Sequence, residues 1–256
     1  MVALDVATGA YRWSITPPFV SPDVGLAEGG IVLDGTTLLL GNNLPNADAL
    51  VAVDAAGHVS WTATPPGTIQ DVVADPGKVV YTASQVAESN GTRVEFLTGY
   101  READGSVAST IELPVFASMS FARDVLYLGD TALLPSTGKV LWDAPGESVF
   151  AVGGSTVVTA SSTGDLVARN ALTGVQVWRA TGAGPTAASS SGQRVIVAGS
   201  LVFVSHPHVI DIRSLADGSH LGFTPAVGQD VDMTPAVGHL FVTGAATLYS
   251  FAPTQS

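Results

Sequence analysis

The sequence contains no cysteine, which excludes disulfides, thiolate catalysis and cysteine-bound metals. Basic residues are also scarce, because 10 Lys and Arg stand against 22 Asp and Glu and give a formal net charge of −12. This balance repels phosphate groups, and Lys and Arg form no cluster, so nucleic acid and anionic membrane surfaces are disfavoured as partners. The longest apolar run, residues 195–204, contains Gly199 and is about half the roughly 20 residues of a membrane helix. We therefore expect no direct membrane insertion.

No signal peptide is expected either, because Met1 leads without a basic region into a repeated pattern. Residues 2–13 consist of an apolar segment, a turn with Gly9 and a second segment that ends in a tryptophan. Residues 168–178 repeat the pattern with alanine, glycine and tryptophan at the same spacing, and residues 52–61 repeat it with a turn one residue shorter. Each copy is typical of a β-hairpin closed by a tight glycine turn.

The turn glycine returns along the whole chain. Successive copies are 33 to 48 residues apart, close to the roughly 40–50 residues of a four-stranded propeller blade, at Gly9, Gly57, Gly105, Gly138, Gly174 and Gly218. Residues 248–251 give a seventh, weaker return. Short β-branched and aromatic segments precede the turns and predict the middle strands, at residues 37–40, 79–82, 125–128, 156–159, 201–204 and 240–243. No segment of twelve residues keeps the apolar period of a helix.

These observations predict an all-β fold, a β-propeller of four-stranded antiparallel blades with about six to seven blades represented. Such blades bury both faces only by stacking. Residues 1–256 are interpreted as a single domain that starts at the third strand of one blade and ends at the third strand of another. We therefore expect an incomplete ring from a larger parent, with Met1 an internal or misassigned start.

The tryptophans fit this geometry, because each can wedge between adjacent blades. They are Trp13, Trp61, Trp142 and Trp178. The third and sixth copies of the repeat carry Ser109 and Gly222 at the aligned positions, and weaker contacts between blades are expected there.

The repeat resembles the pyrroloquinoline quinone (PQQ)-like, or tryptophan-docking, β-propeller repeat. The match is Ala-x-Asp-x-x-x-Gly-x-x-x-Trp at Ala3, Asp5, Gly9 and Trp13, with asparagine in the aspartate column at Ala168, Asn170, Gly174 and Trp178, and weaker at Ala132, Gly138 and Trp142. The resemblance covers essentially the whole chain and implies the fold more specifically than it implies an activity.

Two branches of this family lead to different functions. Catalytic quinoproteins hold PQQ and calcium, have eight blades and about twice this length, and many carry a disulfide that packs on the quinone. The absence of cysteine and of recognisable calcium ligands favours the non-catalytic branch, without a cofactor or metal. The resemblance then implies an extracytoplasmic domain that acts as a protein-interaction scaffold or ligand sensor and is monomeric when its ring is complete. The alternative is a fragment of a PQQ-dependent dehydrogenase.

No catalytic motif stands out. No serine lies in a Gly-x-Ser-x-Gly elbow, so the chain is not expected to be an enzyme. The pair His206 and His208 lacks a third ligand at zinc-like spacing and is interpreted as part of an exposed loop. Asp5 and Asp54 are interpreted as turn caps rather than calcium ligands.

If the chain has a binding site, we expect it on the face that holds the loops between middle strands and the connections between blades; the alternative is that these segments are only connecting loops. The loops at residues 41–49 and 84–93 are long and polar, and the connections 16–18 and 64–66 contain paired prolines that stiffen them. A protein partner or small ligand would meet Asn42, Asn43, Asn46, Asp48, Glu88, Asn90, Arg93 and His206. A carbohydrate-binding propeller would expose aromatic residues here, and only Phe19 and Phe116 are near, which argues against it.

Overall fold

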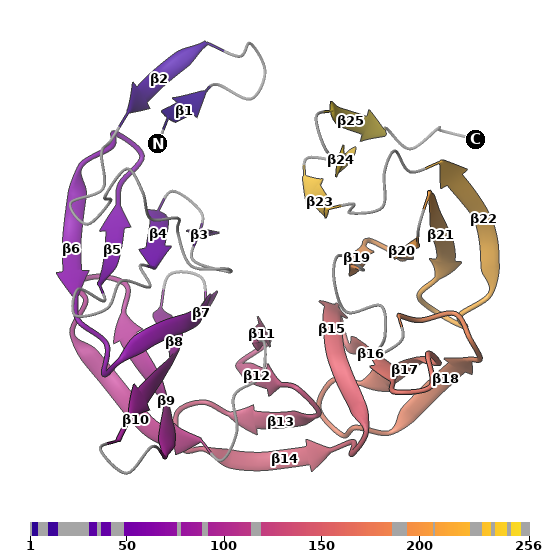
Figure 1. Cartoon of the computed structure of the whole chain (residues 1–256), viewed down its shortest axis with the longest axis horizontal. Helices are drawn as coiled ribbons and strands as arrows, with labels where there is room; N and C mark the ends of the chain where they lie inside the picture. Colours follow the sequence, from indigo (N-terminus) through magenta and orange to yellow (C-terminus); the bar gives the residue numbers. More distant parts are fainter. Residues whose placement is uncertain are drawn as a thin grey trace. The chain divides into compact units, whose positions relative to one another are not determined.

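The structure is a computed structural model that describes residues 2–4, 10–14, 31–34, 37–41, 49–75, 78–88, 92–113, 119–185, 194–206, 208–225, 232–236, 239–244 and 247–251. These residues form 25 β-strands and no helix, which confirms the predicted all-β fold (Figure 1). Consequently, no described segment is a helix long and apolar enough to cross a membrane.

Every sheet is an antiparallel meander whose strands follow chain order. The first two sheets of the chain are β1 (Val2–Leu4) and β2 (Tyr11–Ser14), then β3 (Ile31–Asp34), β4 (Thr37–Gly41), β5 (Leu50–Val53) and β6 (Val59–Ala63). The next two are β7 (Thr68–Asp75), β8 (Val79–Ala87), β9 (Arg93–Arg101) and β10 (Val107–Leu113), then β11 (Met119–Ala122), β12 (Val125–Leu128), β13 (Thr131–Leu134) and β14 (Lys139–Asp143).

The remaining sheets continue the same order. They are β15 (Glu147–Gly153), β16 (Thr156–Ser161), β17 (Leu166–Asn170) and β18 (Gln176–Ala180), then β19 (Val195–Ala198), β20 (Leu201–His206), β21 (Val209–Ser214) and β22 (His220–Pro225), and last β23 (Asp232–Ala236), β24 (His239–Gly244) and β25 (Thr247–Phe251). The five four-stranded sheets are called blades 1 to 5 below. All six predicted middle strands are present, as β4, β8, β12, β16, β20 and β24.

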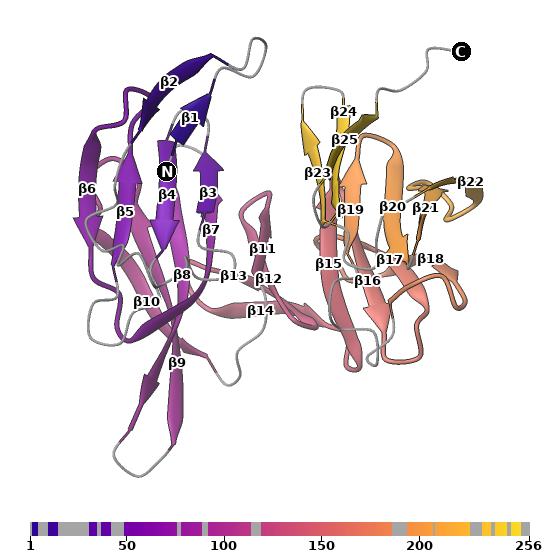
Figure 2. The same cartoon turned by 45° about the horizontal axis from the view of Figure 1, so that its top comes forward.

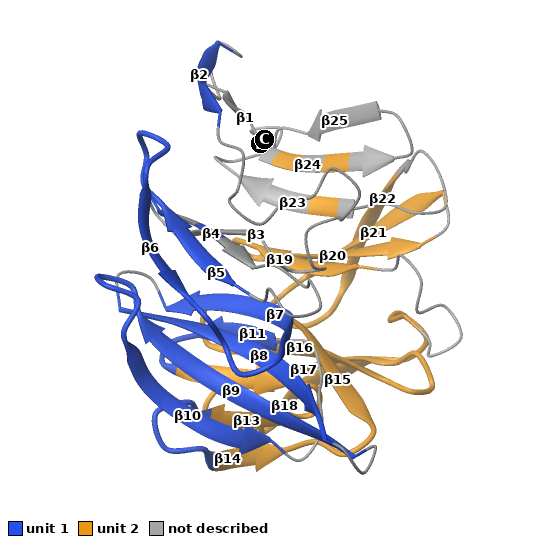
Figure 3. Ribbon diagram, turned by 60° about the vertical axis from the view of Figure 1, so that its left-hand side comes forward, with its two compact units in different colours: residues 1–124, 134–139 blue, residues 125–133, 140–256 orange. Residues whose placement is uncertain are grey.

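The chain divides into two compact units (Figure 3). Unit 1 contains residues 1–124 and 134–139, and unit 2 contains residues 125–133 and 140–256. The two-unit division does not test the predicted single domain, which stays a prediction.

Within unit 1, blades 1 and 2 pack face to face. The first strands β3 and β7 contact one another, and β7 also contacts β11. The shared core is aliphatic except for two aromatic rings, and it comprises Leu39, Leu50, Ala52, Trp61, Ile69, Val72, Val80 and Tyr100. This shared core supplies the stacking of blades that the repeat pattern predicted.

Unit 2 is built in the same way. Strand β15 contacts β19, and β19 contacts β23. Blades 4 and 5 share a core of Ala151, Val158, Leu166, Ala168, Trp178, Ala183, Val195, Val202 and Val204. The other face of blade 5 packs with the sheet β23–β25 through Phe203, Ile210, Met233, Leu240 and Val242.

Each tryptophan joins its blade to the next turn along the chain. The indole lies against the turn glycine, because a Cβ placed on Gly57, Gly105, Gly174 or Gly218 would come within 2.6 to 3.0 Å of an indole carbon. The indole N–H also donates to a backbone carbonyl of that turn, from Trp13 to Ala55 at 2.9 Å, Trp61 to Glu102 at 2.6 Å, Trp142 to Ala171 at 2.9 Å and Trp178 to Leu215 at 2.8 Å. The N–H of each indole is thus hydrogen-bonded, and its ring packs against a glycine.

The contact between blade 2 and the glycine turn of blade 3 differs from these tryptophan–glycine contacts. Here Ile111 of β10, rather than Ser109 at the aligned position, faces Gly138, and a Cβ on Gly138 would lie 3.1 Å from the Ile111 side chain. Pro135 occupies the place where other blades donate a turn amide, as from Leu215 to Ser200 at 2.8 Å. Proline has no N–H, so this bond is absent from blade 3.

Candidate functional site

The long hairpin of blade 2 is the most distinctive feature of the predicted loop face. Strands β8 and β9 each have nine residues, whereas the described middle strands of the other blades have four to six. The hairpin extends beyond the neighbouring strands of unit 1 (Figure 2). The expected loop at residues 84–93 was too long, because β8 continues to Ala87 and β9 begins at Arg93; residues 89–91 lie outside the described residues.

The end of this hairpin is a two-stranded ribbon. Strand β7 pairs with β8 only as far as Gln85, and β10 pairs with β9 only as far as Glu95. Beyond these positions β8 and β9 pair with one another, Val86 with Val94 and Ala87 with Arg93, and no third strand of the described residues pairs with them. We call residues 85–88 and 92–95 the arm.

Hydrogen bonds within the arm add to the pairing of its two strands. The side chain of Gln85 donates from Nε2 to Oε1 of Glu95 at 2.9 Å, and the amide of Glu88 donates to the carbonyl of Thr92 at 2.8 Å. Ala87, Glu88 and Arg93 are exposed. The arm therefore presents a carboxylate and a guanidinium on a hydrogen-bonded ribbon.

The connection between blades 1 and 2 supports the base of the arm. Gly67 has a φ of +76°, and a Cβ there would lie 2.3 Å from the carbonyl oxygen of Gln85. Only glycine fits so close to another backbone. This contact places the connection 64–67 beside the β8–β9 hairpin, as expected for the two kinds of loop on one face.

The other predicted site residues have different outcomes. Asn42, Asn43, Asn46, Asp48 and Asn90 lie outside the described residues, as do Asp5 and Gly9. His206 was expected in an exposed loop, but it belongs to β20, pairs with Val209 and is half-buried. Burial lowers the pKa of His206, although the nearby charge of Asp211 opposes this shift. His206 is in unit 2 and the arm is in unit 1.

The alanine column of the repeat lies opposite the tryptophans. Ala3 pairs with Trp13, Ala52 with Trp61 and Ala168 with Trp178 across adjacent strands. Asp54 caps its turn as predicted, because its Oδ1 accepts from the amides of Ala56 and His58 at 2.8 and 2.9 Å. These hydrogen bonds, first that from His58, lower the pKa of Asp54.

Acidic groups in the described ranges take part in joining strands. Oδ2 of Asp71 accepts from the amide of Met119 at 2.7 Å and so links β7 to β11. Burial raises the pKa of Asp71. Glu147 accepts two hydrogen bonds from Arg169, at 2.7 and 2.9 Å, and Asp211 contacts Arg213 and His220, each at 2.7 Å. Burial opposes ionisation of Glu147, but the hydrogen bonds from Arg169 and Thr159 outweigh it and lower its pKa.

The described residues offer no cluster of carboxylates for the calcium of a catalytic quinoprotein. Among the described residues, no three His, Asp or Glu side chains gather where they could hold a metal ion. Calcium sites use six to eight oxygen ligands, several of them carboxylates. Nothing in the described part of the chain therefore matches the centre that the dehydrogenase alternative requires.

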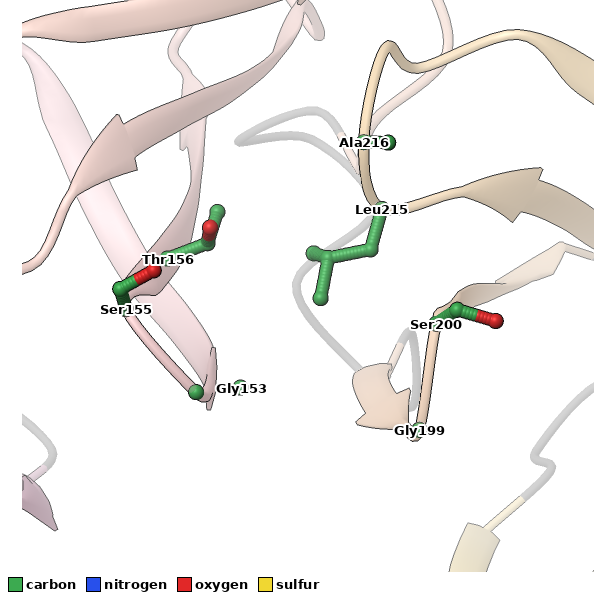
Figure 4. Close-up of a pocket in the computed structure, with 8 residues that line it drawn as sticks. Gly153, Ser155, Thr156, Gly199, Ser200, Leu215 and Ala216 are labelled. Atoms are coloured by element: carbon green, nitrogen blue, oxygen red, sulfur yellow. The ribbon is translucent and has the colours of Figure 1, made fainter.

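Sequence reasoning also missed a pocket at the short glycine turns of unit 2. It has a volume of about 370 Å³ and is lined by Gly153, Gly154, Ser155, Thr156, Gly199, Ser200, Leu215 and Ala216 (Figure 4). These turns are at the opposite ends of the strands from the predicted loop face. The signal in the sequence is slight, a Gly-Gly-Ser and a Gly-Ser at two neighbouring turns.

Comparison with known proteins agrees with this architecture. The chain belongs to the PQQ-like propeller family described as outer membrane protein assembly factor BamB, which matches residues 1–148 and 145–255. Among solved structures, it is similar to BamB from Moraxella catarrhalis, with 16% identity, a TM-score of 0.64, and coverage of 97% of this chain and 77% of that chain. A similarity to the computationally designed Ika8 protein has 12% identity, a TM-score of 0.64, and coverage of 89% and 71%.

The curated proteins give no match. The similarity to the two solved structures establishes the fold alone, because identity is low. The predicted PQQ-like family and the β-propeller fold are confirmed.

Proposed function

We propose that this protein is a non-catalytic scaffold of the cell envelope that binds a protein partner through the arm of blade 2. The observation that carries the proposal is the ribbon of β8 and β9 beyond Gln85 and Glu95, where neither strand pairs with a third strand among the described residues. Unpaired strand edges and exposed charges favour contact with another chain. The family description, an outer membrane assembly factor, supports placement outside the cytoplasm and a protein partner.

The arm has the properties of a contact element rather than of a core element. Its residues extend past the last pairs with β7 and β10, and Ala87, Glu88 and Arg93 are exposed. Gly67 lies against the backbone of Gln85 at the base of the arm, and the prolines at positions 65 and 66 stiffen the segment that leads to it, so we expect little conformational entropy to be lost when a partner binds. A preordered arm is therefore suited to a specific contact.

The test uses two arm variants and one control. In the first variant Asn-Gly replaces residues 86–94 and joins Gln85 to Glu95, and the second reverses both exposed charges, Glu88→Arg with Arg93→Glu. The control, Lys139→Glu, changes an exposed charge on β14. A partner identified by crosslinking in the native envelope is purified, and its Kd is measured against each variant.

We expect the shortened arm to weaken binding at least tenfold and the charge reversal to weaken it severalfold, with the control unchanged. Equal affinity for the wild type and the shortened arm would overturn the proposal. Calcium-dependent binding of PQQ to the intact chain would overturn its non-catalytic part.

A further inference from the structure

The pocket of unit 2 is formed by three turns of two neighbouring blades. Residues 153–156 come from the β15–β16 turn of blade 4, residues 199–200 from the β19–β20 turn of blade 5, and residues 215–216 from the β21–β22 turn of blade 5. The side chains of Thr156 and Leu215 face one another across it (Figure 4). Its volume of about 370 Å³ is in the range of small ligand pockets.

Glycines make the pocket open. A Cβ on Gly153 would lie 2.2 Å from Cγ1 of Val197, so blades 4 and 5 can approach this closely only with glycine there. Gly154 and Gly199 have φ values of +57° and +61°, and a Cβ on either would meet no atom within 4 Å. Much of the wall is therefore bare backbone facing open space.

Hydrogen bonds fix the wall around Leu215. Its amide donates to the carbonyl of Ser200 at 2.8 Å, and its carbonyl accepts from the indole of Trp178 at 2.8 Å. On the other side, the amide of Ala171 donates to the carbonyl of Ser155 at 2.9 Å. The pocket is thus preformed by the same tryptophan joint that holds blades 4 and 5 together.

The lining is uncharged although the protein carries a net charge of −12. Its residues are three glycines, the hydroxyl-bearing Ser155, Thr156 and Ser200, and the apolar Leu215 and Ala216. It contains no aromatic ring, amide or carboxylate side chain of the kind that orients a sugar.

We propose that this pocket binds an aliphatic side chain, that of a leucine, isoleucine or valine, in an uncharged extended segment of a protein partner. Burial of the side chain against Leu215 supplies the affinity, and the flanking peptide groups of the segment meet the hydroxyls of Ser155 and Thr156. A charged side chain is excluded because no opposite charge in the lining offsets its desolvation. The inference rests on the proposed function in that the partner is a protein.

The experiment titrates the isotope-labelled full chain with the peptide N-acetyl-Ala-Leu-Ala-amide and follows backbone amide shifts by NMR. The comparison peptide has lysine in place of leucine. Thr156→Phe fills the pocket, and the matched control Thr163→Phe adds the same ring at the exposed turn at the other end of β16.

We expect saturable shifts at Gly154, Ser155, Gly199 and Ala216 with the leucine peptide, and at least tenfold weaker binding of the lysine peptide. Thr156→Phe should weaken binding of the leucine peptide at least tenfold, and Thr163→Phe should leave this binding unchanged. No saturable shift, equal binding of both peptides, or an unaffected Thr156→Phe variant would overturn the inference.

These outcomes are separate from those of the arm. If the arm variants no longer bind the partner and the leucine peptide does not bind the pocket, only the pocket inference fails. If the peptide binds as expected while the shortened arm still binds the partner normally, only the arm proposal fails.

Discussion

The smallest unit of this fold is one indole resting on one glycine. Trp61 contacts Gly105 in the next turn, and the φ of +71° at that glycine brings the backbone under the ring. The indole N–H then reaches the carbonyl of Glu102 at 2.6 Å. Glycine is required at position 105 for two reasons. Other residues disfavour this φ, and a Cβ would lie 2.7 Å from the ring.

The first prediction separates these two requirements. Gly105→Ala should lower the free energy of unfolding by about 2–4 kcal/mol, from backbone strain and overpacking together. Gly146→Ala is the matched control, because Gly146 has a φ of +81° but a Cβ there would meet nothing within 4 Å. It should cost only about 1–2 kcal/mol. Urea unfolding followed by tryptophan fluorescence measures both, and equal losses would contradict a specific indole contact.

Two carboxylates should give stability opposite dependences on pH. The pKa of Asp71 is raised by burial, so the folded state binds its proton more tightly, and this contribution to stability decreases as pH rises above the ordinary range of Asp. The pKa of Glu147 is lowered, because hydrogen bonds from Arg169 and Thr159 overcome the effect of burial. Its contribution is present at neutral pH and is lost as pH falls through the lowered pKa.

Urea unfolding between about pH 3 and 7 tests this pair. The stability of the wild type relative to Asp71→Asn should fall with rising pH, and its stability relative to Glu147→Gln should rise with pH. If both stability differences changed with pH in the same direction, either the burial of Asp71 or the hydrogen bonding of Glu147 would be contradicted.

At the scale of strands and turns, the middle strands were predictable because apolar β-branched segments end at glycine turns. The arm was not, because Gln85, Glu88 and Arg93 are polar and the pattern of a solvated hairpin is the same as that of a loop. Its ends depend on how far β7 and β10 continue alongside. Ile111 was also missed, because a residue two positions beyond the aligned Ser109 occupies the tryptophan position.

The joint between blades 2 and 3 should be the weakest of those that the structure describes. Trp61 is buried and its replacement by alanine should cost about 3–5 kcal/mol. Ile111 is only half-buried, so Ile111→Ala should cost about 1–2 kcal/mol. Thermal and urea unfolding of both variants provide the measurement, and a larger loss for Ile111→Ala would contradict this ranking.

The arm should contribute little to folding. Replacing residues 86–94 by Asn-Gly removes no residue of the described core of blades 1 and 2 and keeps the pair Gln85–Glu95. The free energy of unfolding should therefore change by less than about 1 kcal/mol. A cooperative transition at the wild-type urea midpoint would support a purely exposed element, and a loss of several kcal/mol would contradict it.

At the scale of the whole molecule, the repeat predicts the fold much better than the function. Six glycines and four tryptophans set the blade pattern in the sequence, and the contacts that the structure describes between these glycines and the neighbouring strands serve stability. The binding surfaces have no comparable signature. The arm is a difference in strand length, and the pocket arises where Gly153, Gly199 and Leu215 of separate turns come together. Sites of this kind depend on which turns become neighbours, and a repeat pattern does not specify that.

The most direct measurement is photo-crosslinking in the native cells, with the photoreactive residue placed at position 88 of the arm or at position 139 of β14. The account predicts one dominant crosslinked protein from position 88 and none from position 139. Absence of a crosslink at position 88, together with a dominant protein crosslink at position 139, would contradict the arm as the site of partner binding.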